Sequence, residues 1–254
     1  MKKYSSTITL SQNSRGIWDF DTVKGCKYGM ELTPKGCYSA CYAASIALRY
    51  GYDFSNSVLR RFDSKSHEDE IINRIKSEKM DFIRIGVMGD PSECWGHTID
   101  MCDKIRQHVN NIVLITKHWE TVPYYLIDKF KSLDLIVNTS ISALDSDYLI
   151  EHRLQQYTRL KNACKSCLRI VSCEFNTDNI NGFICNSIQE RLFKNHNVID
   201  TVLRLSESND LVFNQVVKTE KKVFMSSEKN VTLNDKLAFL GYCKDCPEMC
   251  GVNM

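Results

Sequence analysis

The chain has 254 residues, of which 43% are hydrophobic and 25% are charged, and its formal net charge is +2. A chain of this length can bury a full core in one large α/β domain or in two small ones, and its near-neutral charge gives no overall electrostatic footprint for nucleic acid. No apolar run approaches the ~18 residues of a membrane-spanning helix, and the lysine-containing start lacks the apolar segment of a signal peptide. We therefore expect a cytoplasmic protein without a membrane partner.

Short apolar runs rich in β-branched residues alternate with helical patterns along the chain. In chain order we expect a helix over 67–78, a strand over 82–88, a helix over 97–109, a strand over 111–116, a helix over 122–132, a strand over 133–141, a helix over 147–163, a strand over 168–175, a helix over 188–195 and a strand over 198–205. Ser66 and Asp69 form a start signal for the helix over 67–78, and Pro123 lies in the first turn of the helix over 122–132. Continuous apolar strands of this kind are typical of parallel sheets.

The alternation of strands and helices requires right-handed βαβ crossovers. It predicts an α/β fold, namely a partial (β/α)6-type, TIM-like barrel of parallel strands with a short cysteine-rich C-terminal extension. A doubly wound sheet is the alternative. In either fold, chemistry gathers at the carboxyl ends of the strands.

Polar residues follow the predicted strands at the points where they end. These residues are Gly89, Asp90, Pro91, Thr116, Lys117, Asn138, Ser140, Ser142, Ser172 and Glu174. One interpretation is ordinary capping of the helices that follow. The other is a ring of hydroxyls, amides, a carboxylate and a lysine that holds a polar ligand with a ribose and an amino acid portion.

The chain contains 12 cysteines, which is many for a protein of a reducing compartment. Disulfides are rare there, so the cysteines indicate metal or redox chemistry, although some are simply small buried hydrophobic residues. We expect the latter for Cys102 and Cys185, which have helical or apolar neighbours.

Cys26, Cys37 and Cys41 lie in a glycine-containing loop before a helix that begins near Tyr42. Three thiolates from one loop can hold three irons of a [4Fe–4S] cluster and leave the fourth iron open for a substrate or cofactor. Zinc normally takes four closed protein ligands, and this loop contains no histidine. Zinc with a distant fourth ligand, and thiols without metal, are the alternatives.

The loop GC…GCYSACYAA, followed by a strand that ends in GDP, resembles the radical S-adenosylmethionine (radical SAM) enzymes, and more narrowly a small phage-associated branch of them. The stretches LSQNSRGIWDF, YGYDFSNSVLRRF and GDPSECWGHT resemble the same branch. The resemblance covers the chain from Leu10 to about Leu211. It implies a core barrel over 1–212, including the cysteine loop, and a C-terminal extension over 213–254 with an auxiliary metal or cluster site.

The loop departs from the common family signature C-x3-C-x2-C. Cys37 and Cys41 match the first gap, but Ala44 stands where the third cysteine belongs. The resemblance therefore requires Cys26 to supply the third thiolate from upstream.

The resemblance also implies roles for the residues at the strand ends. Gly89, Asp90 and Pro91 match a turn that contacts the SAM amino group, largely through the backbone. The groups that would hold the SAM carboxylate and ribose are Thr116, Lys117, Asn138, Ser140 and Ser142, with Ser172 and Glu174 from the strand after.

The chemistry implied by the resemblance is reductive cleavage of SAM by the [4Fe–4S] cluster to methionine and a 5′-deoxyadenosyl radical, which takes hydrogen from a substrate. The substrate would be a nucleotide, a modified DNA base, a peptide or another small molecule, and an electron donor such as flavodoxin or ferredoxin would be a partner. The near-neutral charge does not favour binding of a long nucleic acid duplex.

A second group of cysteines, Cys243, Cys246 and Cys250, lies in GYCKDCPEMCG near the C terminus. The spacing C-x2-C-x3-C with a proline is typical of loops that bind iron–sulfur clusters, and zinc competes if a fourth cysteine closes the site. Cys164 and Cys167 are the candidates for that ligand. Two other classes of function remain open, a zinc-binding nucleic-acid-binding module and an iron–sulfur electron carrier without SAM.

Overall fold

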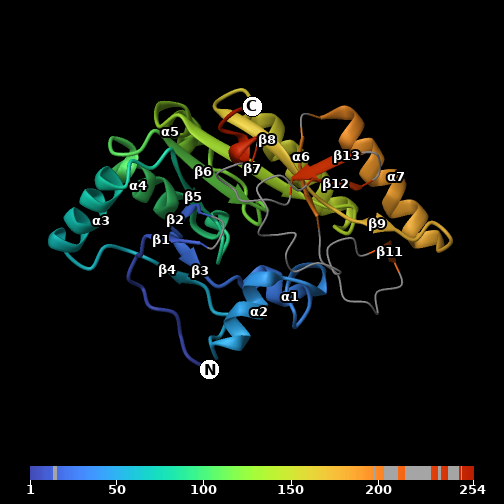
Figure 1. Ribbon diagram of the computed structural model, residues 1–254, viewed down its shortest axis with the longest axis horizontal. Coiled ribbons are helices and arrows are strands. Elements are labelled where there is room, and N and C mark those ends of the chain that lie inside the picture. The colour runs from blue at the N-terminus through green and yellow to red at the C-terminus, as the bar shows by residue number, and fades with distance from the viewer. Residues whose placement is uncertain are drawn as a thin grey trace.

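The computed structural model describes residues 1–13, 16–196, 198–202, 211–214, 230–233, 236–239, 246 and 248–254. A central sheet of seven strands in the order β1-β2-β5-β6-β7-β8-β10 forms its main layer (Figure 1). The strands from β2 to β10 run parallel, and β1 pairs antiparallel with β2 at one edge. The predicted α/β fold with a mostly parallel sheet is confirmed.

The strands of the central sheet are β1 (Ser11–Gln12), β2 (Trp18–Asp19), β5 (Phe82–Ile85), β6 (Asn111–Thr116), β7 (Leu135–Ile141), β8 (Lys165–Ser172) and β10 (Val198–Val202). Two-stranded ribbons pair β3 (Val23–Lys24) with β4 (Val58–Leu59), β9 (Glu174–Phe175) with β11 (Val212–Asn214), and β12 (Asn230–Leu233) with β13 (Lys236–Phe239). The predicted strand over 82–88 is too long, because the Asp21 carboxylate takes the backbone N–H groups of residues 86–88 out of the sheet.

The helices are α1 (Lys27–Leu32), α2 (Tyr42–Arg49), α3 (Lys65–Ser77), α4 (Trp95–Arg106), α5 (Ile127–Ser132), α6 (Asp147–Leu160) and α7 (Ile180–Asn195). The short 3-10 helices are η1 (Cys37–Ser39), η2 (Pro91–Cys94), η3 (Tyr124–Leu126) and η6 (Met249–Gly251). No helix in the described part of the chain combines the length and the apolar character needed to cross a membrane.

Four helix starts differ from the sequence prediction, those of α3, α4, α5 and α7, and for α3 and α7 a side-chain cap explains the difference. Ser64, not Ser66, caps α3, because its hydroxyl accepts a hydrogen bond from the His67 N–H. The last helix starts at Ile180 rather than near residue 188, because the Asn179 side chain accepts from the N–H groups of the first turn.

Helices α3 to α7 all cover the same face of the sheet. Successive strand residues point to opposite faces, and one alternating set packs against these helices. The larger cluster on this face joins Ile83, Leu114 and Val137 of the strands to Ile75, Ile105, Phe130 and Leu160 of the helices. A second cluster continues it with Ile141 and Ile170 against Ile150 and Leu192. Each fully buried side chain of this kind contributes about 1.5–3 kcal/mol.

The strand order from β2 to β10 follows the chain without a reversal. A doubly wound sheet reverses its order at a switch point and carries helices on both faces, so that alternative is wrong for the described residues. The opposite face is covered at one end by the C-terminal turn η6, which packs on Phe82, Val113 and Ile136. Figure 1 shows this C-terminal segment near β7 at the top of the view, with α1 and α2 at the bottom.

Candidate functional site

The sulfurs of Cys26 and Cys37 both lie next to Gly29, where a side chain of that residue would be. The Cys26 sulfur caps α1 and accepts a hydrogen bond from the Gly29 N–H at 3.3 Å. A Cβ atom placed on Gly29 would lie 3.1 Å from Cys26 Sγ and 3.2 Å from Cys37 Sγ. The two sulfurs therefore share one small space, which a side chain at residue 29 would fill.

Cys41 joins this arrangement at the start of α2. Gly36 has φ +76° and lies so close to Cys41 that a Cβ atom would come within 2.5 Å of the Cys41 Cβ, so glycine is required there. Cys41 packs in the same apolar cluster as Cys26 and Ala44. Cys26 thus lies beside the helix that carries Ala44, as the proposed replacement of the missing third cysteine requires.

The three thiols fit a metal group by donor type and by their shared location, but they are not yet arranged as ligands. No three His, Cys, Asp or Glu side chains among the described residues form a ready metal site. Burial raises the pKa of the Cys26 and Cys37 thiols, and the charge of Lys117 opposes the shift at Cys37. Binding of a metal group would therefore release protons.

The turn after β5 lies directly against the strand that leads into Cys26. The Gly25 N–H donates to the Met88 carbonyl at 2.9 Å, and a Cβ atom on Gly89 would lie 2.5 Å from the Val23 carbonyl oxygen. Residue 89 must therefore be glycine because of this close approach. Asp21 holds the same turn, since its carboxylate accepts the N–H groups of residues 86–88 at 2.8–3.0 Å.

Asp90 joins the ends of β5 and β6. It is buried, and its Oδ1 accepts from the hydroxyls of Ser92 and Thr116, each at 2.7 Å. Its Oδ2 accepts from the Lys117 N–H at 2.7 Å. Both carboxylate oxygens are thus engaged within the chain, so the side chains of Asp90 and Thr116 position this turn. Pro91, also buried, begins η2.

A buried charged group lies next to the cysteine loop, and its members are Tyr38, Lys117, Asp145 and Arg153. The Tyr38 hydroxyl donates to the Asp145 carboxylate at 2.9 Å, and the Lys117 ammonium donates to the Tyr38 oxygen. Arg153 is fully buried, forms an ion pair with Asp145 and donates from Nε to the Lys117 carbonyl at 2.6 Å. This group ties the loop between Cys37 and Cys41 to the carboxyl ends of β6 and β7.

The electrostatics of this group are consistent with a permanent ion pair. Burial by itself would raise the pKa of Asp145, but the positive charges of Lys117 and Arg153 lower it below its ordinary value. Burial raises the pKa of Tyr38 well above its usual range, so its hydroxyl stays a hydrogen-bond donor.

Sequence reasoning missed Asp21, Tyr38, Asp145 and Arg153. A signal existed for Arg153, because it lies between Ile150 and Tyr157 on the apolar stripe of its helix, where an arginine needs a buried partner.

The remaining predicted residues of the strand ends lie in different surroundings. Ser140, Ser142 and Ser172 are buried, and the Ser142 N–H donates to Asp145 at 2.8 Å. Asn138 lies in the middle of β7, where its amide donates to the Cys250 carbonyl at 2.8 Å and its Oδ1 has no hydrogen-bond partner among the described residues. The side chain of Glu174 is outside the part of the chain that the structure describes.

Cys250 lies at the other end of the sheet. Lys165, the first residue of β8, donates to the Val252 carbonyl at 2.6 Å, and a Cβ atom on Gly251 would lie 2.9 Å from Cys167 Sγ. Cys250 therefore neighbours Cys167, whereas Cys164 packs on the helix-covered face. The Cys246 thiol donates to Glu248 at 3.3 Å.

Three other cysteines have a predicted role or environment. Cys243 lies outside the described residues. Cys102 is fully buried in the helix-side core, which confirms the prediction for it. Cys185 is half-buried, and its thiol donates to the Ala143 carbonyl at 3.5 Å.

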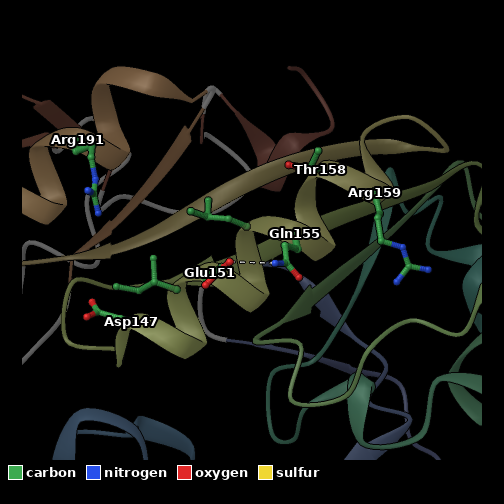
Figure 2. Close-up of a pocket in the computed structure, with 8 residues that line it drawn as sticks. Asp147, Glu151, Gln155, Thr158, Arg159 and Arg191 are labelled. Atoms are coloured by element: carbon green, nitrogen blue, oxygen red, sulfur yellow. Dashed lines mark hydrogen bonds between the residues drawn. The ribbon is translucent and has the colours of Figure 1, made fainter.

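A groove of about 840 Å³ lies between α6 and α7, lined by Asp147, Glu151 and Arg159 of α6 and by Arg191 of α7 among others. Figure 2 shows these charged side chains around it, with Glu151 and Gln155 joined by a hydrogen bond. The groove contains no cysteine and none of the predicted strand-end residues. We therefore place the candidate site at the cysteine loop.

The comparisons with known proteins found no relative of this chain. No protein-family model, no curated protein and no solved structure matches this chain. The arrangement of the cysteine loop at the carboxyl ends of the parallel strands is therefore the main basis for a functional hypothesis.

Proposed function

We propose that this protein is a radical SAM enzyme in which Cys26, Cys37 and Cys41 hold a [4Fe–4S] cluster with one iron left for SAM. The observation that carries the proposal is the meeting of the Cys26 and Cys37 sulfurs above Gly29, with Cys41 in the same cluster of side chains. A loop with three thiols and no competing histidine matches this cluster better than a closed zinc site.

The sheet supports a partial barrel of the (β/α)6 type as the scaffold. Its parallel strands follow the chain order, and α3 to α7 cover one face only. This is the arrangement in which helices form an outer layer and the opposite face is left for ligands, with chemistry at the carboxyl ends of the strands.

When bound, the cluster supplies the electron that cleaves SAM and yields the 5′-deoxyadenosyl radical for hydrogen abstraction. The chain's own residues position and enclose the reactants. Asp21 and Gly89 hold the turn after β5 against the strand that precedes Cys26. Asp90 fixes the adjoining end of β6, so the backbone of this turn is available in a defined place for the amino group of SAM.

The buried charged group prepares the environment of Cys37. Lys117 and Arg153 are positive and lie close enough to act on the Cys37 thiol, so they favour its thiolate form. Tyr38 has φ +57° and needs support in this left-handed conformation, which its bond to Asp145 supplies. The buried charged group therefore stabilises the thiolate form of Cys37 and the left-handed backbone conformation of Tyr38.

The substrate proposed from the resemblance is a nucleotide, a modified DNA base or a peptide, and the electron donor is a flavodoxin-like or ferredoxin-like protein. A reducing, cytoplasmic setting suits the free thiols. The C-terminal cysteines Cys243, Cys246 and Cys250 are proposed to hold an auxiliary cluster or zinc, and Cys167 is the better placed of the two candidate fourth ligands because it neighbours Cys250.

Anaerobic purification followed by iron, sulfide and zinc analysis tests the proposal. We expect brown protein with about four irons per chain, or about eight with the auxiliary site, that forms 5′-deoxyadenosine from SAM and dithionite. The double variant Cys37→Ala/Cys41→Ala should lose this product. Cys185→Ala, which removes a half-buried cysteine outside the loop, should keep it. Colourless protein with bound zinc, or product formation by the double variant, would contradict the assignment.

A further inference from the structure

A small polar cavity of about 50 Å³ lies between the N-terminal segment and the turn after β5, lined by Thr9, Ser11, Lys24 and Arg60 together with two aspartates and Met88. This volume accommodates several water-sized atoms. Thr9 and Ser11 are exposed, so the cavity opens to solvent, and Arg60 is only 3% exposed and forms its base.

Arg60 is a buried cation whose hydrogen-bonding capacity is largely unused. Both Nη atoms donate to a single acceptor, the Thr9 hydroxyl at 3.2 Å, and Nε has no hydrogen-bond partner among the described residues. Within the same part of the chain, neither Arg60 nor Lys24 forms an ion pair with a carboxylate. A buried guanidinium without an anionic partner is costly, so an anion from outside the chain would stabilise it.

The two aspartates of the cavity offset these cations only in part, because they act on them without reaching ion-pair distance and each is already engaged elsewhere. Asp19 forms an ion pair with Arg84 at 2.9 Å and accepts from the Asn13 amide at 3.1 Å. Asp21 accepts three backbone N–H groups of the turn after β5. Lys24 and Arg60 therefore remain as the two cations available to a ligand.

We propose that this cavity binds a phosphate group. Beside the two engaged carboxylates, two cations and two hydroxyls around a small space supply the donors that a tetrahedral oxyanion needs, and arginine suits phosphate because of its fork of donors. Phosphate bound there interacts with Lys24, Arg60 and Thr9.

The cavity adjoins the cysteine loop. Lys24 precedes Gly25 and Cys26 in the chain, and Met88 both lines the cavity and packs in the cluster that contains Cys26 and Cys41. The link to catalysis rests on the proposed function: a substrate anchored here by its phosphate would lie next to the reaction centre, which favours a nucleotide over a peptide. Binding of phosphate itself does not depend on that function.

The test is equilibrium dialysis of radiolabelled inorganic phosphate against the full chain at constant ionic strength, without SAM or reductant. We expect saturable binding at one site. Lys24→Gln and Arg60→Gln should each weaken it about tenfold, and Thr9→Val should weaken it less. Arg61→Gln is the matched control, because it removes the same charge from the neighbouring exposed residue and should change the affinity less than about twofold.

Circular dichroism establishes whether each variant is folded. If Arg60→Gln does not fold, the affinities of Lys24→Gln and Thr9→Val test the proposal instead. These two variants should fold, since Thr9 is exposed and Lys24 is half-buried. Absence of saturable phosphate binding overturns the proposal. It is equally overturned if Lys24→Gln and Thr9→Val bind as the wild type does, or if Arg61→Gln loses as much affinity as Lys24→Gln.

Competition identifies the source of the phosphate. Displacement of the label by thymidine 5′-monophosphate, but not by thymidine, supports a nucleotide phosphate. Displacement by neither supports free phosphate as the ligand of the same site. Since the cysteine double variant should bind phosphate normally while losing SAM cleavage, a failure of the proposed function is distinguishable from a failure of this site.

Discussion

Two segments of the chain carry cysteines close together with glycine, yet the structure places them at different ends of the sheet. Cys26, Cys37 and Cys41 lie at the carboxyl ends of the strands, beside the buried charged group of Tyr38, Lys117, Asp145 and Arg153. Cys250 lies toward the amino ends of β7 and β8, in an apolar cluster with Val113 and Ile136. Both groups pack against apolar side chains, and the N-terminal loop also bonds through Tyr38 to the buried charged group. The comparison teaches that similar cysteine spacing can occur in two different settings.

The largest effect should follow from removing one partner of the ion pair beside the N-terminal loop. Arg153→Met leaves the Asp145 carboxylate buried beside Tyr38, and we expect a loss of about 3–5 kcal/mol in the free energy of unfolding. Urea denaturation measures it. Arg191→Met, which removes an exposed arginine of α7, should cost less than about 0.5 kcal/mol. Equal losses in both variants would contradict a special role for the buried charged group.

A smaller effect is expected at the C-terminal segment. Gly251 has φ +92°, and a Cβ atom there would lie 2.9 Å from Cys167 Sγ, so Gly251→Ala combines backbone strain with a clash. We expect a loss of about 2–3 kcal/mol in stability.

Gly51→Ala separates the two causes, because Gly51 has φ +74° with no atom within 4 Å of the added Cβ. It should cost about 1 kcal/mol. If the two alanine variants are equally stable, the contact of the C-terminal segment with β8 is not a tight one.

A third effect is a dependence of stability on pH, and it comes from His118 at the carboxyl end of β6. Burial, with a further contribution from the nearby positive Arg153, lowers the pKa of His118 to about 3, so this imidazole is neutral in the folded protein. The unfolded chain binds the proton at a higher pH, near the ordinary pKa of 6.5. The stability contribution is therefore fully present above that pH and is lost as the pH falls from there toward the folded value.

The slope from this one group should be up to about 1.4 kcal/mol per pH unit. His118→Asn removes the titrating imidazole and keeps a residue that tolerates φ +47°, so the wild type should lose stability more steeply than this variant between neutral and mildly acidic pH. Urea titrations at several pH values measure the difference. Parallel curves would show that His118 titrates normally.

The smallest effect is expected from Tyr38→Phe, which removes the hydroxyl that donates to Asp145 and accepts from Lys117. The loss of stability should be about 0.5–1.5 kcal/mol. Tyr148→Phe, at an exposed tyrosine, is the control and should be neutral. If Tyr38→Phe also changes the absorption spectrum of the reconstituted protein and Tyr148→Phe does not, the hydroxyl supports the loop that we propose holds the metal group.

Much of the fold could be predicted because the signals are local. The apolar run over 111–116 is β6 to the residue, and the alternation of runs indicated the parallel sheet. Boundaries failed where a side chain distant in sequence intervened, as Asp21 does at the end of β5, or where a cap lay outside the apolar pattern, as at Asn179.

The sequence by itself determined the types and order of the main helices and strands from α3 to β10, and it grouped Cys37 with Cys41 and Cys246 with Cys250, because these properties depend on neighbours along the chain. Only the tertiary structure brought Cys26 to Cys37 over Gly29, paired Asp145 with Arg153 and engaged both oxygens of Asp90 within the chain. It also left the Arg60 Nε beside Lys24 without a hydrogen-bond partner among the described residues. Such contacts join residues far apart in sequence, and their energies depend on burial and distance, which no local pattern specifies.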